Sequence, residues 1–170
     1  EIAADLDPAY TLTIGKRTLD PKSGGWDVFF DRVPRKPYKS HAVKFDKRSA
    51  SITSSGSQTV IRISDMQAES FKGALEITLY NGSPLFNVAA VIATEVDSTA
   101  ILYDAGLVSK EQVWQNLAWS DVKNELQTTK VEHDTEATHQ EVKYRTIIGQ
   151  TKGGSLALFP SPHQYFYPLD

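Results

Sequence analysis

Apolar and polar positions alternate along most of the chain, and the apolar positions are rich in β-branched and aromatic residues. In the segment Trp26–Phe30, for example, Trp26, Val28 and Phe30 would share one face of an extended chain. Alternation with a period of two, interrupted by turn residues, predicts β-strands. The predicted strands are Tyr10–Ile14, Trp26–Phe30, Ala42–Phe45, Ser49–Thr53, Thr59–Ile63, Ala74–Tyr80, Leu85–Val96, Thr99–Tyr103, Glu125–Val131, Val142–Ile148 and Ser155–Phe159.

Two of the turns predict hairpins. Ser54-Ser55-Gly56-Ser57 separates two predicted strands, and Asn81-Gly82-Ser83-Pro84 separates the clearest pair, Ala74–Tyr80 and Leu85–Val96. Asn-Gly is a strong hairpin signal because both residues tolerate a positive φ. Leu85–Val96 is almost continuously apolar, which predicts a strand in the middle of a sheet with both faces covered.

One segment has helical spacing instead. Ser109 and Gln112 resemble a capping box, and Val113, Trp114 and Leu117 recur at intervals close to those of a helix. We predict a short helix from about Lys110 to Ala118, with an irregular crossing loop as the alternative.

About ten strands and at most one or two short helices predict an all-β fold, namely an antiparallel β-sandwich. A closed barrel is disfavoured because the predicted strands differ in length. A chain of 170 residues without a linker or an internal repeat predicts a single domain over residues 1–170.

Composition excludes several classes of function. The chain has no cysteine, which excludes disulfides and thiolate chemistry, and it has no apolar run long enough for a membrane span. The formal net charge of −3 argues against nucleic-acid binding, although residues 31–48 are rich in lysine and arginine. That basic segment is either a solvated loop or a site for a phosphate or carboxylate.

The histidines are the first candidates for chemistry. His133 and His139 lie in an acidic loop, but their spacing matches no metal-binding pattern, so we expect no metal and no cofactor. His41 lies in the basic segment and faces either solvent or an anion. His163 stands between Pro162 and an aromatic run, where a rigid backbone can hold one imidazole orientation, and it is the one candidate acid/base.

Aromatic residues are the most informative group, because their rings stack on the C–H faces of sugars. The predicted ligand-binding residues are Trp114, Trp119, His163, Tyr165 and Tyr167. The alternative for the two tryptophans is packing in the core.

Several predicted strands resemble those of galactose-mutarotase-like β-sandwich domains, which accompany catalytic modules in bacterial glycoside hydrolases and polysaccharide lyases. The resemblance lies in Phe71–Tyr80 and its hairpin partner, in Tyr144–Ile148 and in Gly154–Pro160. It implies a supersandwich-like fold and a saccharide-related function. Mutarotases transfer protons with a histidine and a glutamate, but no such pair can be placed here from the sequence.

Three hypotheses follow. The first is a non-catalytic carbohydrate-associated module that binds a glycan or docks a catalytic partner, the second is a saccharide-processing enzyme that uses His163, and the third is a structural or assembly module. The chain begins at Glu1 rather than Met, which favours a secreted or periplasmic protein with its signal peptide removed. It ends on apolar residues, which favours a fragment of a longer protein or a partner in the form of a second polypeptide segment.

Overall fold

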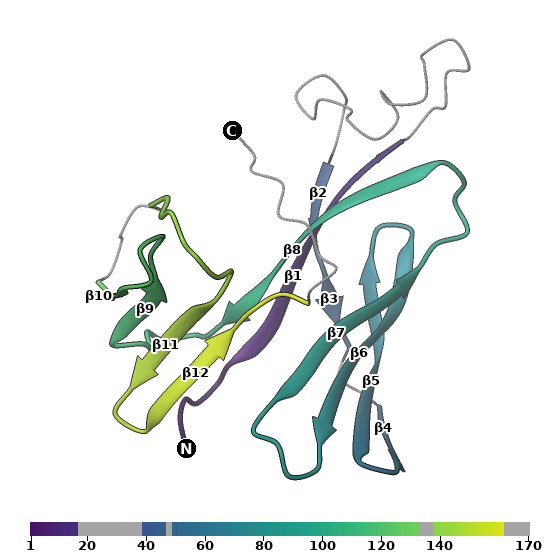
Figure 1. Ribbon diagram of the computed structural model, residues 1–170. Helices are drawn as coiled ribbons and strands as arrows, with labels where there is room; N and C mark the ends of the chain where they lie inside the picture. Colours follow the sequence, from purple (N-terminus) through teal and green to yellow (C-terminus); the bar gives the residue numbers. More distant parts are fainter. Residues whose placement is uncertain (17–38, 47–48, 133–137, 162–170) are drawn as a thin grey trace. The chain divides into compact units, whose positions relative to one another are not determined.

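The computed structural model describes residues 1–16, 39–46, 49–132 and 138–161 (Figure 1). The described residues form strands, turns and loops, with no helix among them, which confirms the predicted all-β class. Every strand pairing that has a recorded register is antiparallel. The predicted strand Trp26–Phe30 lies outside the described residues.

The chain divides into two compact units, which we describe separately. The sandwich unit comprises Pro8–Leu107, and the four-stranded unit comprises Glu1–Asp7 with Val108–Asp170. The expectation of a single domain over residues 1–170 stays a prediction.

Two sheets build the sandwich unit. One has the strand order β2-β1-β8, and the other has the order β3-β5-β6-β7 with β4 also paired to β5. Their bounds are β1 Asp7–Lys16, β2 Lys39–Ala42, β3 Lys44–Phe45, β4 Ala50–Ser55, β5 Gln58–Ala68, β6 Phe71–Tyr80, β7 Phe86–Ala93 and β8 Thr99–Val108.

The two sheets share a core. Leu12 of β1 packs with Ala68 of β5 and Phe71 of β6, and each of these side chains is at most 7% exposed. Ile14, Val43, Ile92 and Ile101 surround this cluster. Apolar side chains from the facing surfaces of two antiparallel sheets are the basis of a β-sandwich, and the predicted fold class is confirmed.

A β-bulge sets which side chains of β5 enter this core. The register of β5 against β6 shifts between Ser64 and Met66, and the extra residue Asp65 has φ of 66°. An extra residue reverses the alternation of side chains beyond it. Ile61 and Ile63 before the bulge therefore share a face with Met66 and Ala68 after it, while Arg62 pairs with Glu76 on the opposite face.

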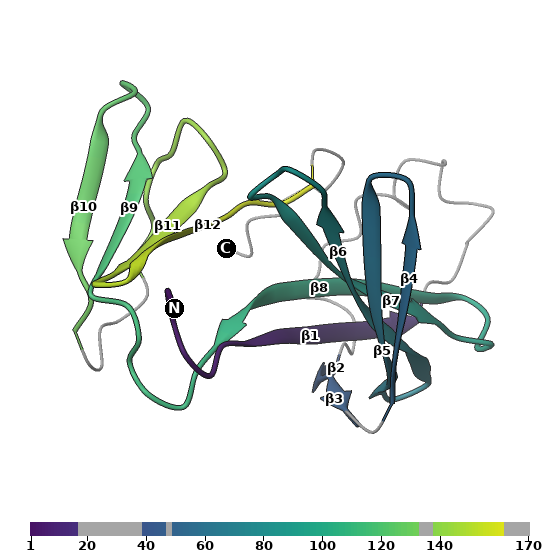
Figure 2. The same ribbon diagram turned by 90° about the horizontal axis from the view of Figure 1, so that it is seen from below.

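Both predicted hairpins are present. Strand β4 pairs with β5 through a turn that contains Gly56 (φ 58°), and β6 pairs with β7 through a turn that contains Gly82 (φ 74°). Figure 2 shows these four strands as neighbouring ribbons.

The predicted position of the Leu85–Val96 strand is wrong. Strand β7 is the last in its sheet, so among the described strands it pairs with β6 alone. Phe86 and Val91 are 48% and 42% exposed, so its faces are not both covered. The continuous apolar run correctly predicted a strand. It could not indicate which strands lie beside it.

The four-stranded unit contains one sheet with the order β10-β9-β11-β12 (Figures 1 and 2). Its strands are β9 Asn116–Ser120, β10 Leu126–Lys130, β11 Ile147–Thr151 and β12 Gly154–Leu158. The N-terminal residues contact this sheet, because Thr151 Oγ1 donates to the Ile2 carbonyl at 2.6 Å.

The predicted helix from about Lys110 to Ala118 is wrong. Residues 109–115 form an irregular segment, and Asn116–Ser120 is strand β9, paired with both β10 and β11. The Gln112 side chain donates to the Val131 carbonyl at 2.8 Å instead of capping a helix. Sheet pairing on both sides of β9 outweighs the helical spacing of a short segment.

Candidate functional site

A hollow of about 330 Å³ lies in the four-stranded unit, lined by residues 143–146 and 159–161. Ile147, the first residue of β11, pairs with Leu158, the last residue of β12. Residues 143–146 precede β11 and residues 159–161 follow β12, so the two lining segments begin side by side. The predicted strand Val142–Ile148 is therefore correct only at its end, because residues 143–146 form an irregular segment before β11.

Backbone hydrogen bonds hold the first lining segment. Lys143 N donates to the Ser120 carbonyl at 3.0 Å, and Thr146 N donates to the Tyr144 carbonyl at 2.8 Å. Val142 forms an isolated bridge with Asp121 at the end of β9. The lining segment is thus held at the end of β9 and continues into β11.

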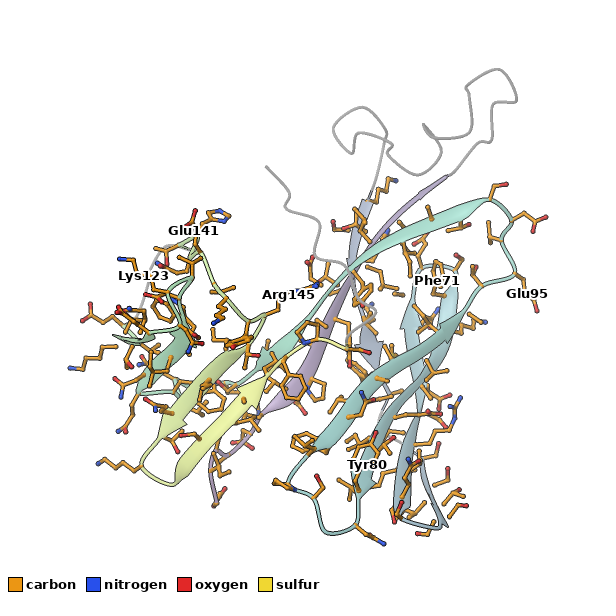
Figure 3. The ribbon with its side chains drawn as sticks, viewed as in Figure 1. Phe71, Tyr80, Glu95, Lys123, Glu141 and Arg145 are labelled. Carbon is orange, nitrogen blue, oxygen red and sulfur yellow. The ribbon has the colours of Figure 1, made fainter. Side chains whose placement is uncertain are left out.

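Two aromatic rings on this hollow are open to solvent. Tyr144 and Phe159 are each 53% exposed. Lys143 Nζ lies 5.5 Å from the centroid of the Tyr144 ring, a cation–π distance, and Figure 3 shows Arg145 in the segment that leads into β11. Exposed rings next to cationic and hydroxyl groups suit a ligand that is apolar on one face and hydroxylated at its edge.

A tightly hydrogen-bonded turn connects β9 to β10 nearby. Asp121 Oδ1 accepts from the backbone N–H groups of Lys123 and Glu125, each at 2.9 Å, and Oδ2 accepts from Gln127 Nε2 at 2.8 Å. The backbone hydrogen bond from Glu125 is the main cause of the lowered pKa of Asp121, with further contributions from Gln127 and Lys123. This carboxylate stabilises the turn and stays ionised at neutral pH.

The structure places Trp114 and Trp119 on the same face of the four-stranded sheet. A Cβ added to Gly149 would lie 2.5 Å from the Trp114 ring, so the indole covers the face to which that Cβ would point. Gly149 pairs with Leu117, and residues directly opposite in an antiparallel pair share a face. Trp119, two residues after Leu117, lies on that face too.

The contact with Gly149 gives Trp114 a packing role, which was the alternative interpretation from the sequence. Both tryptophans are partly buried. The other predicted ligand-binding residues, His163, Tyr165 and Tyr167, lie outside the described residues. The proposed acid/base role of His163 therefore stays a prediction.

A second hollow, of about 280 Å³, lies in the sandwich unit. Its lining includes Lys39 and His41 of β2, Glu69 and Ser70 of the β5–β6 turn, and the apolar Ile14 and Val96. His41 Nδ1 lies 3.8 Å from Glu69 Oε2. Lys39 and His41, two residues of the basic segment, thus line a hollow and do not lie in a fully solvated loop.

Tyr144 is not recognisable as a candidate from the sequence, because it falls inside a predicted strand, where an alternating tyrosine suggests packing. Phe159 ends a predicted strand, and its proximity to the segment of Tyr144 could not be found without the β11–β12 register. Glu69 is one of several available carboxylates in the sequence, and nothing in the pattern distinguishes it from the others.

Within residues 1–16, 39–46, 49–132 and 138–161, no three histidine or carboxylate side chains gather as metal ligands would. His133, of the acidic loop considered above, lies outside these ranges. The described part of the chain also contains no helix of the length and apolar character that crossing a membrane requires.

Comparison with known proteins gives no assignment, because no family model, curated protein or solved structure matches this chain. The resemblance to galactose-mutarotase-like domains therefore stays a prediction.

Proposed function

We propose that this chain is a non-catalytic, carbohydrate-associated β-sandwich module of a secreted or periplasmic protein. In this proposal it binds a glycan at the hollow of the four-stranded unit. The observation that supports the proposal most is the pair of exposed rings, Tyr144 and Phe159, that line this hollow.

The chemistry of the lining fits a sugar better than a fully apolar ligand. A pyranose presents C–H groups on one face and hydroxyls around its edge. Tyr144 and Phe159 supply ring surfaces, while Lys143, Thr146 and Ser161 supply donors and acceptors at the rim. The volume of about 330 Å³ lies at the small end of ligand pockets, which suits one or two sugar rings of a chain that continues into solvent.

A binding experiment with single variants tests this proposal. A panel of plant and bacterial polysaccharides is screened first, and the affinity for the best ligand is then measured by isothermal titration calorimetry. Tyr144→Ala and Phe159→Ala are each expected to weaken binding by about three- to tenfold, because each removes a stacking surface.

Tyr80→Ala is the matched control, since Tyr80 is an exposed tyrosine of the sandwich unit at the end of β6 (Figure 3). It should leave the affinity unchanged. Binding that tolerates both Tyr144→Ala and Phe159→Ala, or no binding to any member of the panel, contradicts the proposal.

A further inference from the structure

The hollow of the sandwich unit is built by strands that the core itself positions. Leu12 pairs with His41 and Ile14 pairs with Lys39, and directly opposed residues share a face. Leu12 and Ile14 point into the core, so His41 and Lys39 lie on the inward face of β2. They meet Glu69 and Ser70 at the edge of the sandwich.

Glu69 occupies a backbone position that favours glycine. Ala68 pairs with Phe71, so Glu69 and Ser70 are the two residues of the tight β5–β6 turn. Glu69 has φ of 51°. A positive φ at the first central residue alone is typical of a type II′ turn, where glycine predominates. A glutamate at this position places a carboxylate at the hollow where glycine would suit the turn better.

The polar groups of the hollow divide into cationic and hydroxyl-binding sets. Lys39 supplies a positive charge, and His41, whose Nδ1 faces Glu69 Oε2, supplies its other ring nitrogen, Nε2, for an anion. Thr94 Oγ1 donates to Ser70 Oγ at 3.0 Å, which leaves the Ser70 hydroxyl proton to be donated to a ligand. Thr99 Oγ1 donates to the Val96 carbonyl at 2.8 Å, so its lone pairs accept, as do those of Glu69.

We infer that this hollow is a second binding site, for a single sugar unit that carries a carboxylate. The ligand carboxylate lies against Lys39 and His41, its hydroxyls bond to Glu69, Ser70 and Thr99, and its C–H face rests on Ile14 and Val96. The apolar side chains of Ile14 and Val96 favour a sugar over a simple anion, and the charge of Lys39 favours an acidic sugar over a neutral one. The inference rests on the proposed function in its choice of a sugar, but it uses none of the same residues.

The probes are sodium glucuronate and sodium galacturonate, with methyl glucoside, acetate and inorganic phosphate for comparison. Binding to the intact chain is followed by heteronuclear NMR. The hexuronates are expected to shift the signals of His41, Ser70 and Thr99 and to bind at least tenfold more tightly than methyl glucoside or acetate. Equal affinity for acetate or phosphate overturns the inference in favour of simple anion attraction, and equal affinity for methyl glucoside overturns the role of the carboxylate.

Two variants separate the two sets of contacts. Lys39→Met keeps an apolar stem and should weaken hexuronate binding about tenfold or more, whereas Lys44→Met, which removes a charge from the same segment outside the hollow, should not. Glu69→Gly suits the backbone conformation and should reduce the preference for hexuronate over acetate. An unchanged hexuronate affinity in Lys39→Met, or an unchanged preference in Glu69→Gly, refutes the assignment.

The experiment also distinguishes this inference from the proposed function. Tyr144→Ala should leave hexuronate binding at the His41 hollow intact. Hexuronates that shift Tyr144 and Phe159 but not His41 would refute the second site. A screened glycan that shifts neither Tyr144 nor Phe159 would refute the proposed function, whatever the hexuronates do at His41.

Discussion

At the scale of single residues, the contact between Trp114 and Gly149 explains why a glycine lies in the middle of β11. The indole ring occupies the space where any larger residue would place its Cβ. Glycine weakens a strand unless close packing requires it. The pair therefore ties the irregular segment before β9 to the sheet.

Gly149→Ala is expected to destabilise the protein by about 1–3 kcal/mol, because the ring or the strand must move to admit the methyl group. Urea denaturation followed by circular dichroism measures the change. Gly106→Ala is the control, since a Cβ there meets nothing within 4 Å. Equal stabilities of the two variants would show that Trp114 does not pack on Gly149.

The carboxylate of Asp121 is expected to make the stability of the fold depend on pH. Its folded-state pKa is lowered mainly by the backbone hydrogen bond from Glu125. A lowered pKa means that the ionised form stabilises the fold above the unfolded-state pKa, near 3.8, and that this contribution is lost as the pH falls through the folded-state pKa.

Asp121→Asn should therefore be less stable than the wild type at pH 7, and the difference should shrink below about pH 4. Urea midpoints at pH 7, 5 and 3 measure it, with Asp104→Asn as a control for the loss of one negative charge. A difference between wild type and Asp121→Asn that stays constant from pH 7 to pH 3 is incompatible with this role.

At the scale of elements, β7 is the last of the described strands in its sheet, and it has no charged residue from Phe86 to Ala93. Edge strands of natural proteins usually carry charges, prolines or bulges, because their free backbone groups pair with other chains. Exposed apolar side chains on β7 add to this tendency.

Val91→Lys is expected to raise the concentration at which the protein self-associates, with little change in its unfolding midpoint, because Val91 is 42% exposed. Light scattering against protein concentration is the measurement. Val122→Lys makes the same exchange in the β9–β10 turn and should have a smaller effect. If both variants change self-association equally, net charge is responsible and the edge is not.

The elements also show how far the sequence determines this structure. The hairpins at Ser54–Ser57 and Asn81-Gly82 were predictable because turn chemistry is local. The helix over Lys110–Ala118 was predicted wrongly because Trp114 and Leu117 fit helical spacing, whereas their partners, Gly149 and strands β10 and β11, are distant in sequence. The position of β7 in its sheet and the hollow lined by Tyr144 and Phe159 could not be predicted either, because both depend on contacts between residues that are distant in sequence.

At the scale of the whole molecule, each of the two units carries a hollow of its own. Two exposed aromatic rings line the hollow of the four-stranded unit, and Lys39, His41 and Glu69 line that of the sandwich unit beside apolar residues. The two proposed sites therefore differ in the kind of sugar that each would select. Which sites a ligand occupies is therefore more informative than whether it binds.

The most direct test is an NMR titration of the intact chain with the glycan selected in the binding screen, in which perturbed backbone signals are mapped onto the structure. We expect perturbations at Tyr144, Thr146 and Phe159, and their loss in Tyr144→Ala. Perturbations that avoid these residues, or that persist unchanged in Tyr144→Ala, would contradict the claim that this hollow binds carbohydrate.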